Sequence, residues 1–436
     1  MSKIKSIKAR EVLDSRGIPT VEADLKTEQG IFSAQVPSGT SEGKYEAIEL
    51  RDGGRRFFGE GVLKAVKNIE EIINSKLKGE DVSNQKKIDE ILIELDGTKN
   101  KSHLGANALL GVSIACCRAG AGAKMIPLYQ YIAEIFNFPA FAPPAGGASV
   151  GRQFSIFKAP KPCFNVLNGG AHAGSNLDIQ EFMIVPQFER FEESLRTGVE
   201  IYHCLKEILK EKFGVLATNV GQEGGFVPPV SETKNAIDLI MKAIEKSGYS
   251  RKTMIGLDCA ASQFFKDGKY NFEGKNRKRE ELSDFYQDLV KEYPILFLED
   301  PFSQDDWQSW QRFVIGLANH HDKVGGKSTV LVVGDDLTVT SLKRMELAKK
   351  KNACNGVIIK PNQIGTVTET IKAVKLAKQF GWKVIVSHRS GDTGDNFISD
   401  LAVGINADFI KAGAPARGER VTKYNRLLRI EEELRS

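Results

Sequence analysis

Short apolar runs recur along the last two thirds of the chain, and most are separated by stretches long enough for a helix. The runs occupy residues 163–167, 182–185, 254–257, 295–298, 330–333, 356–359, 383–386 and 407–410. Amphipathic patterns fit helices at 233–246, 342–351 and 367–380. Repeated strand–helix units indicate a parallel sheet, and about eight of them in roughly 280 residues match an α/β fold of the TIM-like β/α barrel type. An open, doubly wound sheet is the alternative.

The first 138 residues follow a different order of elements. Alternation of polar and apolar positions predicts strands at 4–11, 20–26 and 31–36, and helical spacing follows at 61–76, 82–95 and 105–123. Strands followed by helices predict a smaller N-terminal α+β domain over residues 1–138. Residues 139–160 include a segment rich in Pro, Gly and Ala, which breaks any helix and indicates a linker or insertion. The barrel is therefore expected at residues 161–436.

Size and charge narrow the class of protein. A chain of 436 residues is too long for one ordinary core, so two domains are expected. The 61 basic and 56 acidic residues give a net charge of +5, a small surplus that does not indicate nucleic-acid binding. The basic run Asn276-Arg-Lys-Arg279 is interpreted as a solvated loop.

Membrane insertion and secretion are not expected. We find no segment approaching the ~18 apolar residues of a membrane helix, and the N-terminus lacks the apolar core of a signal peptide. The six cysteines are dispersed at positions 116, 117, 163, 204, 259 and 354. In a chain of this length they are typical of reduced core residues in a cytosolic protein.

Charged residues follow six successive apolar runs of the predicted barrel. They are, in order, Asp258, Glu299, Asp335, Lys360, His388 and Lys411. The C-terminal ends of barrel strands surround one mouth, where such enzymes perform their chemistry. Three carboxylates would repel one another there unless a cation lay among them, and oxygen ligands suit Mg²⁺. A salt-bridge network with Lys360 and Lys411 is the alternative.

Whether Glu181 and Glu223 also reach the barrel mouth depends on the direction of the chain around them. His172 lies in a glycine-rich loop after the first run, and Glu181 stands at the beginning of the second run rather than its end. Glu181 would reach the mouth if that strand were antiparallel to the others. Glu223 follows the short run 216–220 in Gln-Glu-Gly-Gly, where a turn with positive φ explains the glycines equally well.

Taken together, these segments resemble the enolase family over nearly the whole chain. The motifs that carry the resemblance are Asp14-Ser-Arg-Gly17, Ser38-Gly-Thr-Ser41, Leu167-Asn-Gly-Gly170, Gln180-Glu-Phe-Met183, Glu223-Gly-Gly225, Gly256-Leu-Asp-Cys-Ala260, Glu299-Asp-Pro-Phe302, Asp335-Asp-Leu-Thr-Val-Thr340, Lys360-Pro-Asn-Gln-Ile-Gly365, Ser387-His-Arg-Ser-Gly391 and Lys411-Ala-Gly-Ala-Pro-Ala-Arg417. The resemblance implies a barrel with an antiparallel second strand and an N-terminal domain that carries a lid and dimer contacts.

The resemblance also implies an activity and a role for each matching residue. The reaction is the reversible, Mg²⁺-dependent dehydration of 2-phospho-D-glycerate to phosphoenolpyruvate in glycolysis and gluconeogenesis, with two Mg²⁺ per active site. Lys360 matches the base, Glu223 the acid, and Glu181 and His388 stand with them as catalytic residues. The implied metal ligands are Asp258, Glu299, Asp335 and, on the lid, Ser41. The implied substrate-binding residues are His172, Gln180, Arg389, Ser390 and Lys411.

Some positions depart from the family pattern. Gln222 stands where many members have Asp, and the loss of that acid is expected to weaken Glu223 as an acid. Gln263 replaces a common Glu, and Glu42 stands where Thr is typical. Residues 139–160 and 319–328 are longer than usual. His320-His321 are interpreted as solvated loop residues.

The resemblance extends to partners and location. It implies a homodimer or higher homo-oligomer, cytoplasmic localisation, and association with the cell surface without a signal peptide, together with a secondary binding role. It requires no nucleic acid and no membrane insertion. Two rival functions are a superfamily enzyme acting on a different carboxylate and a non-catalytic binding protein. Arg389, Ser390 and the lid at 38–43 argue against the first, and the full set of catalytic residues argues against the second.

Overall fold

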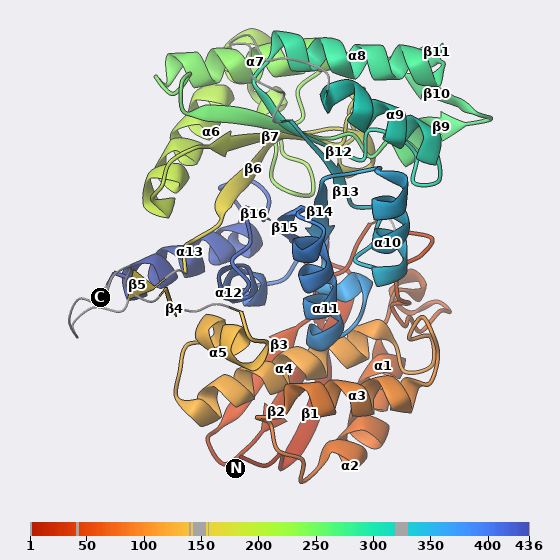
Figure 1. Cartoon of the computed structure of the whole chain (residues 1–436), viewed down its shortest axis with the longest axis vertical. Coiled ribbons are helices and arrows are strands. Elements are labelled where there is room, and N and C mark those ends of the chain that lie inside the picture. The colour runs from red at the N-terminus through yellow and green to blue at the C-terminus, as the bar shows by residue number, and fades with distance from the viewer. Residues whose placement is uncertain are drawn as a thin grey trace.

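The computed structural model describes residues 2–40, 43–138, 141–142, 154–155, 157–318 and 330–435. Figure 1 shows an N-terminal domain, coloured red to orange, lying below a barrel coloured yellow to blue. The two predicted architectures are both present: a three-stranded sheet with helices, then a closed eight-stranded barrel. The alternative of an open sheet is therefore wrong.

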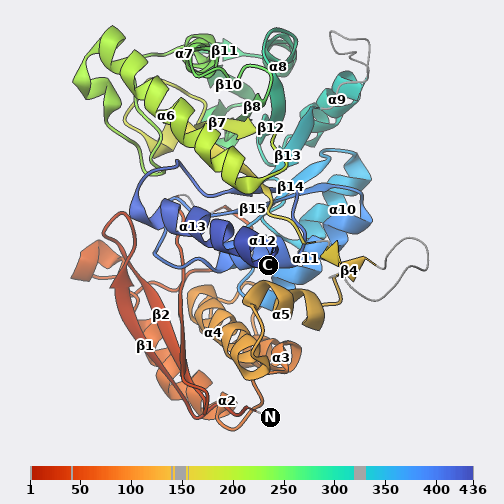
Figure 2. The same ribbon diagram turned by 90° about the vertical axis from the view of Figure 1, so that its left-hand side faces the viewer.

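The N-terminal domain packs an antiparallel sheet against helices. Its strands are β1 (Ser6–Leu13), β2 (Pro19–Lys26) and β3 (Ile31–Gln35), close to the predicted ranges. The helices are the short 3-10 helix η1 (Arg56–Gly59), α1 (Leu63–Lys67), the π-helical turn η2 (Asn68–Ile73), α2 (Asn74–Leu77), α3 (Gln85–Asp96), α4 (Ala106–Lys124) and α5 (Leu128–Ile135). The helix predicted at 61–76 is thus interrupted by a π-helical turn. In Figure 2, α4 lies along the sheet.

The membrane expectation needs correction at α4. By length and composition this helix is apolar enough to cross a membrane, contrary to the prediction from the sequence. However, 83% of its 18-residue apolar window is buried inside the structure, where it packs on β2 and β3. Core helices of this kind pass the same length and composition test, so the apolarity of α4 is explained by packing.

All eight predicted barrel strands form. They are β6 (Lys161–Asn168), β7 (Glu181–Pro186), β8 (Thr253–Asp258), β12 (Ile295–Glu299), β13 (Leu331–Gly334), β14 (Gly356–Ile359), β15 (Lys383–Ser387) and β16 (Phe409–Lys411). β7 is antiparallel to both neighbours, with Glu181 paired to Asn168 on one side and to Asp258 on the other. The antiparallel second strand is confirmed, and Glu181 lies at the mouth.

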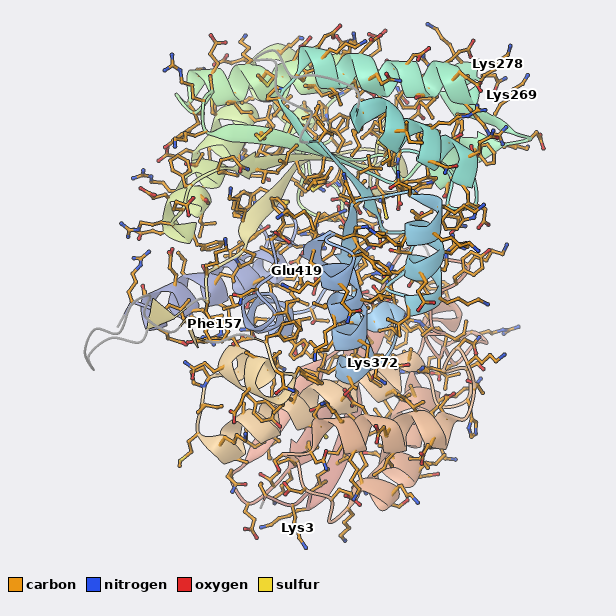
Figure 3. All side chains as sticks on the ribbon, viewed as in Figure 1. Lys3, Phe157, Lys269, Lys278, Lys372 and Glu419 are labelled. Atoms are coloured by element: carbon orange, nitrogen blue, oxygen red, sulfur yellow. The ribbon has the colours of Figure 1, made fainter. Side chains whose placement is uncertain are left out.

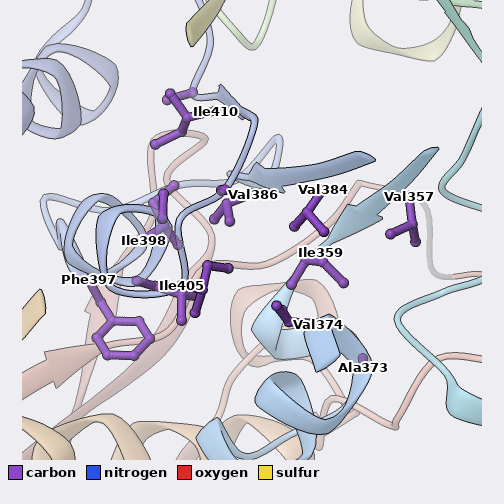
Figure 4. Close-up of a cluster of buried hydrophobic side chains, with 14 of the residues drawn as sticks. Val357, Ile359, Ala373, Val374, Val384, Val386, Phe397, Ile398, Ile405 and Ile410 are labelled. Atoms are coloured by element: carbon purple, nitrogen blue, oxygen red, sulfur yellow. The ribbon is translucent and has the colours of Figure 1, made fainter. Parts of the chain in front are cut away.

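The helices surround the barrel and bury the outer faces of its strands. They are α6 (Phe191–Phe213), α7 (Thr233–Lys246), α8 (Arg279–Glu292), α9 (Trp307–Ala318), α10 (Leu342–Lys351), α11 (Val367–Gln379), α12 (Phe397–Gly404) and α13 (Gly418–Glu433). Figure 4 shows Ile359 of β14 near Val374 of α11, and Val386 of β15 near Ile398 of α12. A second apolar cluster, including Met183 and Phe297, fills the barrel interior.

The structure differs from the prediction at the basic run. Asn276 and Arg277 of the basic run belong to strand β11 (Lys275–Arg277), and Arg279 begins α8, so the run is not a loop. Strand β11 forms a hairpin sheet with β9 (Phe265–Lys266) and β10 (Lys269–Phe272). Figure 3 shows Lys269 and Lys278 together on that side of the molecule.

The run 216–220 begins in a 3-10 helix, η4 (Val215–Thr218). The six cysteines are free and, except for half-buried Cys204, buried. The segment 319–328, including His320-His321, and most of 139–160 lie outside the described residues; the latter retains the short strands β4 (Phe141–Ala142) and β5 (Phe154–Ser155).

An ion pair between the two domains provides a test of this packing. Arg118 of α4 donates to both carboxylate oxygens of Asp395, at 2.6 and 2.8 Å. Burial acts to raise the pKa of Asp395, but Arg118 outweighs it and lowers the pKa below its usual value. A lowered folded-state pKa means that the pair stabilises the fold above the unfolded pKa of about 3.9, and that this is lost as pH falls through the folded pKa.

We therefore expect Asp395→Asn to lower the free energy of unfolding by about 1.5–3 kcal/mol at pH 7, the range for a charged hydrogen-bonded pair. In urea titrations, the difference from wild type should shrink steadily below about pH 4. Glu71→Gln breaks an exposed pair with Lys67 and should change stability by less than about 0.5 kcal/mol. A pH-independent loss in Asp395→Asn would contradict the role of the charge.

Candidate active site

One cavity lies at the barrel mouth, beneath the loop that leaves β3, and it encloses about 480 Å³ when the open solvent in it is included. Eleven of the thirteen predicted site residues line it: His172, Gln180, Glu181, Glu223, Asp258, Asp335, Lys360, His388, Arg389, Ser390 and Lys411. Glu299 is fully buried directly behind the cavity, and Ser41 lies outside the described residues. The predicted residues thus converge because the barrel brings its strand ends together.

Lys411 stands at the centre of the acidic side of the cavity. Its Nζ lies 3.0 Å from Asp258 Oδ2, 2.9 Å from Glu299 Oε1 and 3.1 Å from Glu181 Oε1. Burial opposes its charge, but these three carboxylates outweigh burial and raise the pKa of Lys411 well above its usual value. The cavity therefore contains a permanently charged ammonium group that is fixed by three acids.

Lys360 follows β14 and pairs with Asp335. Burial acts to lower the pKa of Lys360, but Asp335 outweighs it, so the pKa is raised, with Arg389 and Lys411 opposing. Asp335 is held from its other side by Gln363 Nε2, 3.1 Å from Oδ1. The amine of Lys360 is therefore directed into the cavity by a short, well-bonded segment.

A pair of buried carboxyls faces two histidines. His172 Nδ1 lies 3.3 Å from Glu223 Oε2 and 3.9 Å from Glu181 Oε1, while His388 Nε2 lies 3.4 Å from Glu223 Oε1. Burial and the nearby Glu223 raise the pKa of Glu181 well above its usual value. Burial acts the same way at Glu223, but His172 outweighs it and lowers the pKa. Of the two carboxyls, Glu181 therefore holds a proton more readily than Glu223.

Three buried polar atoms of the carboxyl pair and the two histidines lack a hydrogen-bond partner among the described residues. Within the part of the chain that the structure describes, His172 Nδ1, Glu181 Oε2 and His388 Nε2 have no hydrogen-bond partner of proper geometry. Leaving such groups unsatisfied in a protein interior is costly, so they are expected to meet a bound molecule with hydrogen-bonding groups. The cavity is therefore suited to a polar ligand.

The tautomer of His388 is fixed by Arg420. The fully buried Arg420 donates from Nη1 to His388 Nδ1 at 2.6 Å and to Arg389 O at 2.7 Å. Because a guanidinium only donates, Nδ1 accepts and the ring proton lies on Nε2, the atom that faces Glu223. Burial and Arg420 lower the pKa of His388 well below its usual value, so the ring is neutral.

The N-terminal domain closes one side of the cavity. Arg389 Nη1 donates to Glu46 Oε2 at 2.8 Å, and Ser390 Oγ accepts from the Thr40 backbone amide at 2.8 Å. A bridge between Ser38 and Gly391 ties the same two loops together. Arg389 and Ser390 are therefore placed where the lid loop meets the barrel, with residues 41 and 42 lying outside the described residues.

The departures from the family pattern have specific partners. Gln222 Oε1 accepts from Thr40 Oγ1 at 2.5 Å, so its side chain contacts the lid loop rather than Glu223. Gln263 donates to Gln180 Oε1 at 2.6 Å and accepts from the Ala171 amide at 3.3 Å. Both glutamines therefore join loops around the mouth.

The predicted metal ligands fit a hard cation by their chemistry. Asp258 and Glu299 end neighbouring strands, and burial together with Asp258 raises the pKa of Glu299 well above its usual value. Such mutual destabilisation of carboxylates is relieved by a divalent cation among oxygen ligands. Lys411 pairs with Asp258 and Glu299, and Lys360 pairs with Asp335, so the ion pairs of the predicted alternative are also present at the mouth.

Two other acidic groups have ligand atoms within 4.8 Å of one another: His172 with Glu181 and Glu223, and Asp300 with Asp335 and Asp336. Asp300 accepts from the amides of Asp335 and Asp336 at 3.1 and 2.6 Å, so it anchors the loop after β13. Burial and Asp335 raise the pKa of Asp336 to about 7.

Sequence reasoning missed several residues of the site. Glu46 and Arg420 contact predicted site residues, yet they lie outside every motif and follow no apolar run. Thr40, Gln363, Asp300 and Asp336 lie inside the motifs that carry the resemblance, so their position was a usable signal. Arg420 lies in the first turn of α13, and only the folded chain brings it to His388.

Comparison with known protein families agrees with this geometry. Residues 4–132 match the N-terminal domain of enolase, and residues 156–436 match the enolase C-terminal TIM barrel domain. The two matches agree with the fold: the three-stranded sheet lies within residues 4–132, and the closed barrel lies within residues 156–436. The chain belongs to the enolase family.

Proposed function

We propose that this protein catalyses the reversible dehydration of 2-phospho-D-glycerate to phosphoenolpyruvate, a step of glycolysis and gluconeogenesis. Family membership makes the chain an enzyme, a lyase of the enolase superfamily; the substrate is our proposal. The observation that carries it is the meeting in one cavity of an amine, a carboxyl pair and a guanidinium–hydroxyl pair. These are Lys360, Glu181 with Glu223, and Arg389 with Ser390.

Lys360 removes the C2 proton in the proposed reaction. That proton is weakly acidic, because its loss places two negative charges on one carboxylate. The charged Lys411, held among three acids, is a preorganised group that favours the charge as it develops. Lys360 must be neutral to act as a base; Arg389 and Lys411 act in that direction, while its pairing with Asp335 opposes it.

The second half of the reaction breaks the bond between C3 and its hydroxyl oxygen. The electron pair left at C2 forms the double bond to C3, and the hydroxyl leaves as water with a proton from Glu223. Because Glu181 holds a proton more readily than Glu223, Glu181 is the group from which Glu223 is supplied with a proton. The neutral His388 directs Nε2 at the same carboxyl.

Arg389 and Ser390 bind the phosphate group. A guanidinium offers several donors in one plane and suits phosphate oxygens, and a neighbouring hydroxyl adds a further contact. His172 and Gln180 complete the substrate-binding set at the opposite side of the cavity. This arrangement favours a phosphorylated substrate over the unphosphorylated acids that another superfamily enzyme would use.

Two Mg²⁺ per site are part of the proposal. Asp258, Glu299 and Asp335 would hold one, and Ser41 would join the other. Bound there, the cations supply positive charge for the substrate carboxylate in its doubly charged form. Asp335 would then no longer be a free counter-charge for Lys360, which favours the neutral amine.

The test is formation of phosphoenolpyruvate, followed by its ultraviolet absorbance. Purified protein with 2-phospho-D-glycerate should lose turnover down to background in EDTA, and Mg²⁺ added in excess should restore it, because carboxylates bind a hard divalent ion. Glycerate without phosphate is the control and should not react. Full turnover in EDTA, or equal turnover of glycerate, would contradict the proposal.

The expectations on partners and location are also proposals. We propose a homodimer or higher homo-oligomer in the cytoplasm, without nucleic acid or membrane insertion. Cell-surface association with a secondary binding role is proposed as an additional property.

A further inference from the structure

A buried carboxylate of the N-terminal domain lies at the N-terminus of a barrel helix. Asp89 of α3 is fully buried, and one of its oxygens accepts from the Thr368 amide in the first turn of α11 at 2.8 Å. Its other oxygen accepts from Ser113 Oγ at 2.6 Å and from Gln85 Nε2 at 3.0 Å. A carboxylate at this position complements the partial positive charge of the helix end.

Ser113 of α4 completes the contact. Its hydroxyl oxygen accepts from the Val367 amide at 3.0 Å, so its single proton is available for Asp89. The two first amides of α11 are therefore bonded by side chains of the other domain. Figure 1 shows α11 extending from the barrel down to the N-terminal domain, and α11 contacts both α3 and α4.

A second contact holds the same helix turn from the side. Lys101 Nζ pairs with Glu369 Oε1 at 2.8 Å, and Glu369 Oε2 accepts from the Thr366 hydroxyl at 2.9 Å. Gly365 adopts φ +101°, and a Cβ there would lie 3.3 Å from Lys101 Cγ. The domains are thus in close contact immediately before α11.

The segment before α11 carries Lys360. The 3-10 helix η6 (Pro361–Gln363) follows Lys360 directly, and the Gly365 amide donates to Pro361 O at 2.9 Å. Gln363 of this helix bonds Asp335, the partner of Lys360. The start of α11 is therefore connected to Lys360 by a short segment that has its own hydrogen bonds.

We propose that Asp89 and Ser113, together the helix clamp, are positioning residues for Lys360. They fix the start of α11 and thereby the segment 361–366 that sets the position of the amine. The inference rests on the proposed function only for the role of Lys360; the clamp itself is a statement about the domain interface. The N-terminal domain then has a part in proton removal beyond its lid.

The test compares three variants. Asp89→Asn removes the charge at nearly constant shape, and Ser113→Ala is a milder change in case the first variant folds poorly. Asp400→Asn is the matched control, because Asp400 is a buried carboxylate that pairs with Arg426 at 2.7 and 2.8 Å and does not line the cavity. Each variant is measured by hydrogen–deuterium exchange of the peptide covering 361–371, by steady-state kinetics, and by exchange of the substrate C2 proton.

Both clamp variants should exchange this peptide about tenfold faster or more, because local opening becomes easier. We expect kcat and C2 exchange to fall about tenfold or more, with KM changing less than about threefold, since Arg389 and Ser390 keep their places. Asp400→Asn should be less heat-stable but retain wild-type kcat per folded molecule. Unchanged peptide exchange, or faster exchange with wild-type kcat, would overturn the inference. If wild-type protein does not turn over 2-phospho-D-glycerate, the proposed function fails, and the peptide exchange alone decides whether the clamp exists.

Discussion

Lys360→Ala is expected to abolish exchange of the C2 proton of 2-phospho-D-glycerate with solvent and, with it, dehydration. The amine is the group proposed to take the proton, and general base catalysis by a placed side chain contributes roughly 10²–10⁴-fold. Turnover should therefore fall by at least about that factor. The measurement is loss of the C2 proton signal by nuclear magnetic resonance in deuterated water.

A matched lysine variant controls for surface charge. Lys269→Ala lies on the exposed hairpin strand β10, on the side of the molecule labelled in Figure 3, and should exchange and turn over like wild type. Because Lys360→Ala leaves Asp335 without its ammonium partner, folding of the variant is checked by circular dichroism. A folded Lys360→Ala protein that still exchanges the proton at the wild-type rate would remove Lys360 from the role of base.

Glu223→Gln is expected to separate the two halves of the reaction. The glutamine keeps the shape and can still bond Asn165 Nδ2, which lies 2.8 Å from Glu223 Oε2, but it cannot donate an acid proton. C2 exchange should persist within about tenfold of wild type while dehydration falls by roughly 10²–10⁴-fold. Both rates are read from the same deuterated sample.

The exposed Glu232→Gln serves as the control and should leave both rates unchanged. Equal loss of exchange and dehydration in Glu223→Gln would assign this carboxyl to proton removal instead. Retained dehydration would show that another acid protonates the leaving hydroxyl.

The strands of the barrel could be predicted because their burial leaves a direct trace in the sequence. Strands covered on both faces are continuous apolar runs, and all eight runs became strands. The direction of β7 was implied by the family resemblance, and it explains how Glu181, at the start of its strand, reaches the mouth. Short polar strands gave no such trace, and β11 was therefore taken for a loop.

The site residues that end a barrel strand could be predicted, and those that act through contacts between the domains could not. Asp258, Glu299 and Lys411 end barrel strands, so strand ends alone located them. Glu46 and Asp89 were not found, because each acts on a residue about 280 or more positions away, Asp89 on Thr368 and Glu46 on Arg389. Contacts between domains depend on how the domains pack, and no local pattern records that packing.

In the proposed reaction, a neutral amine and a carboxyl pair at one barrel mouth take a proton from C2 and expel the 3-hydroxyl. The most direct measurement is proton magnetic resonance of wild-type protein with Mg²⁺ and 2-phospho-D-glycerate in deuterated water. We expect the C2 proton signal to be replaced by deuterium while the vinyl signals of phosphoenolpyruvate appear. A sample in which the substrate spectrum stays unchanged, with the protein folded and the metal present, would contradict it.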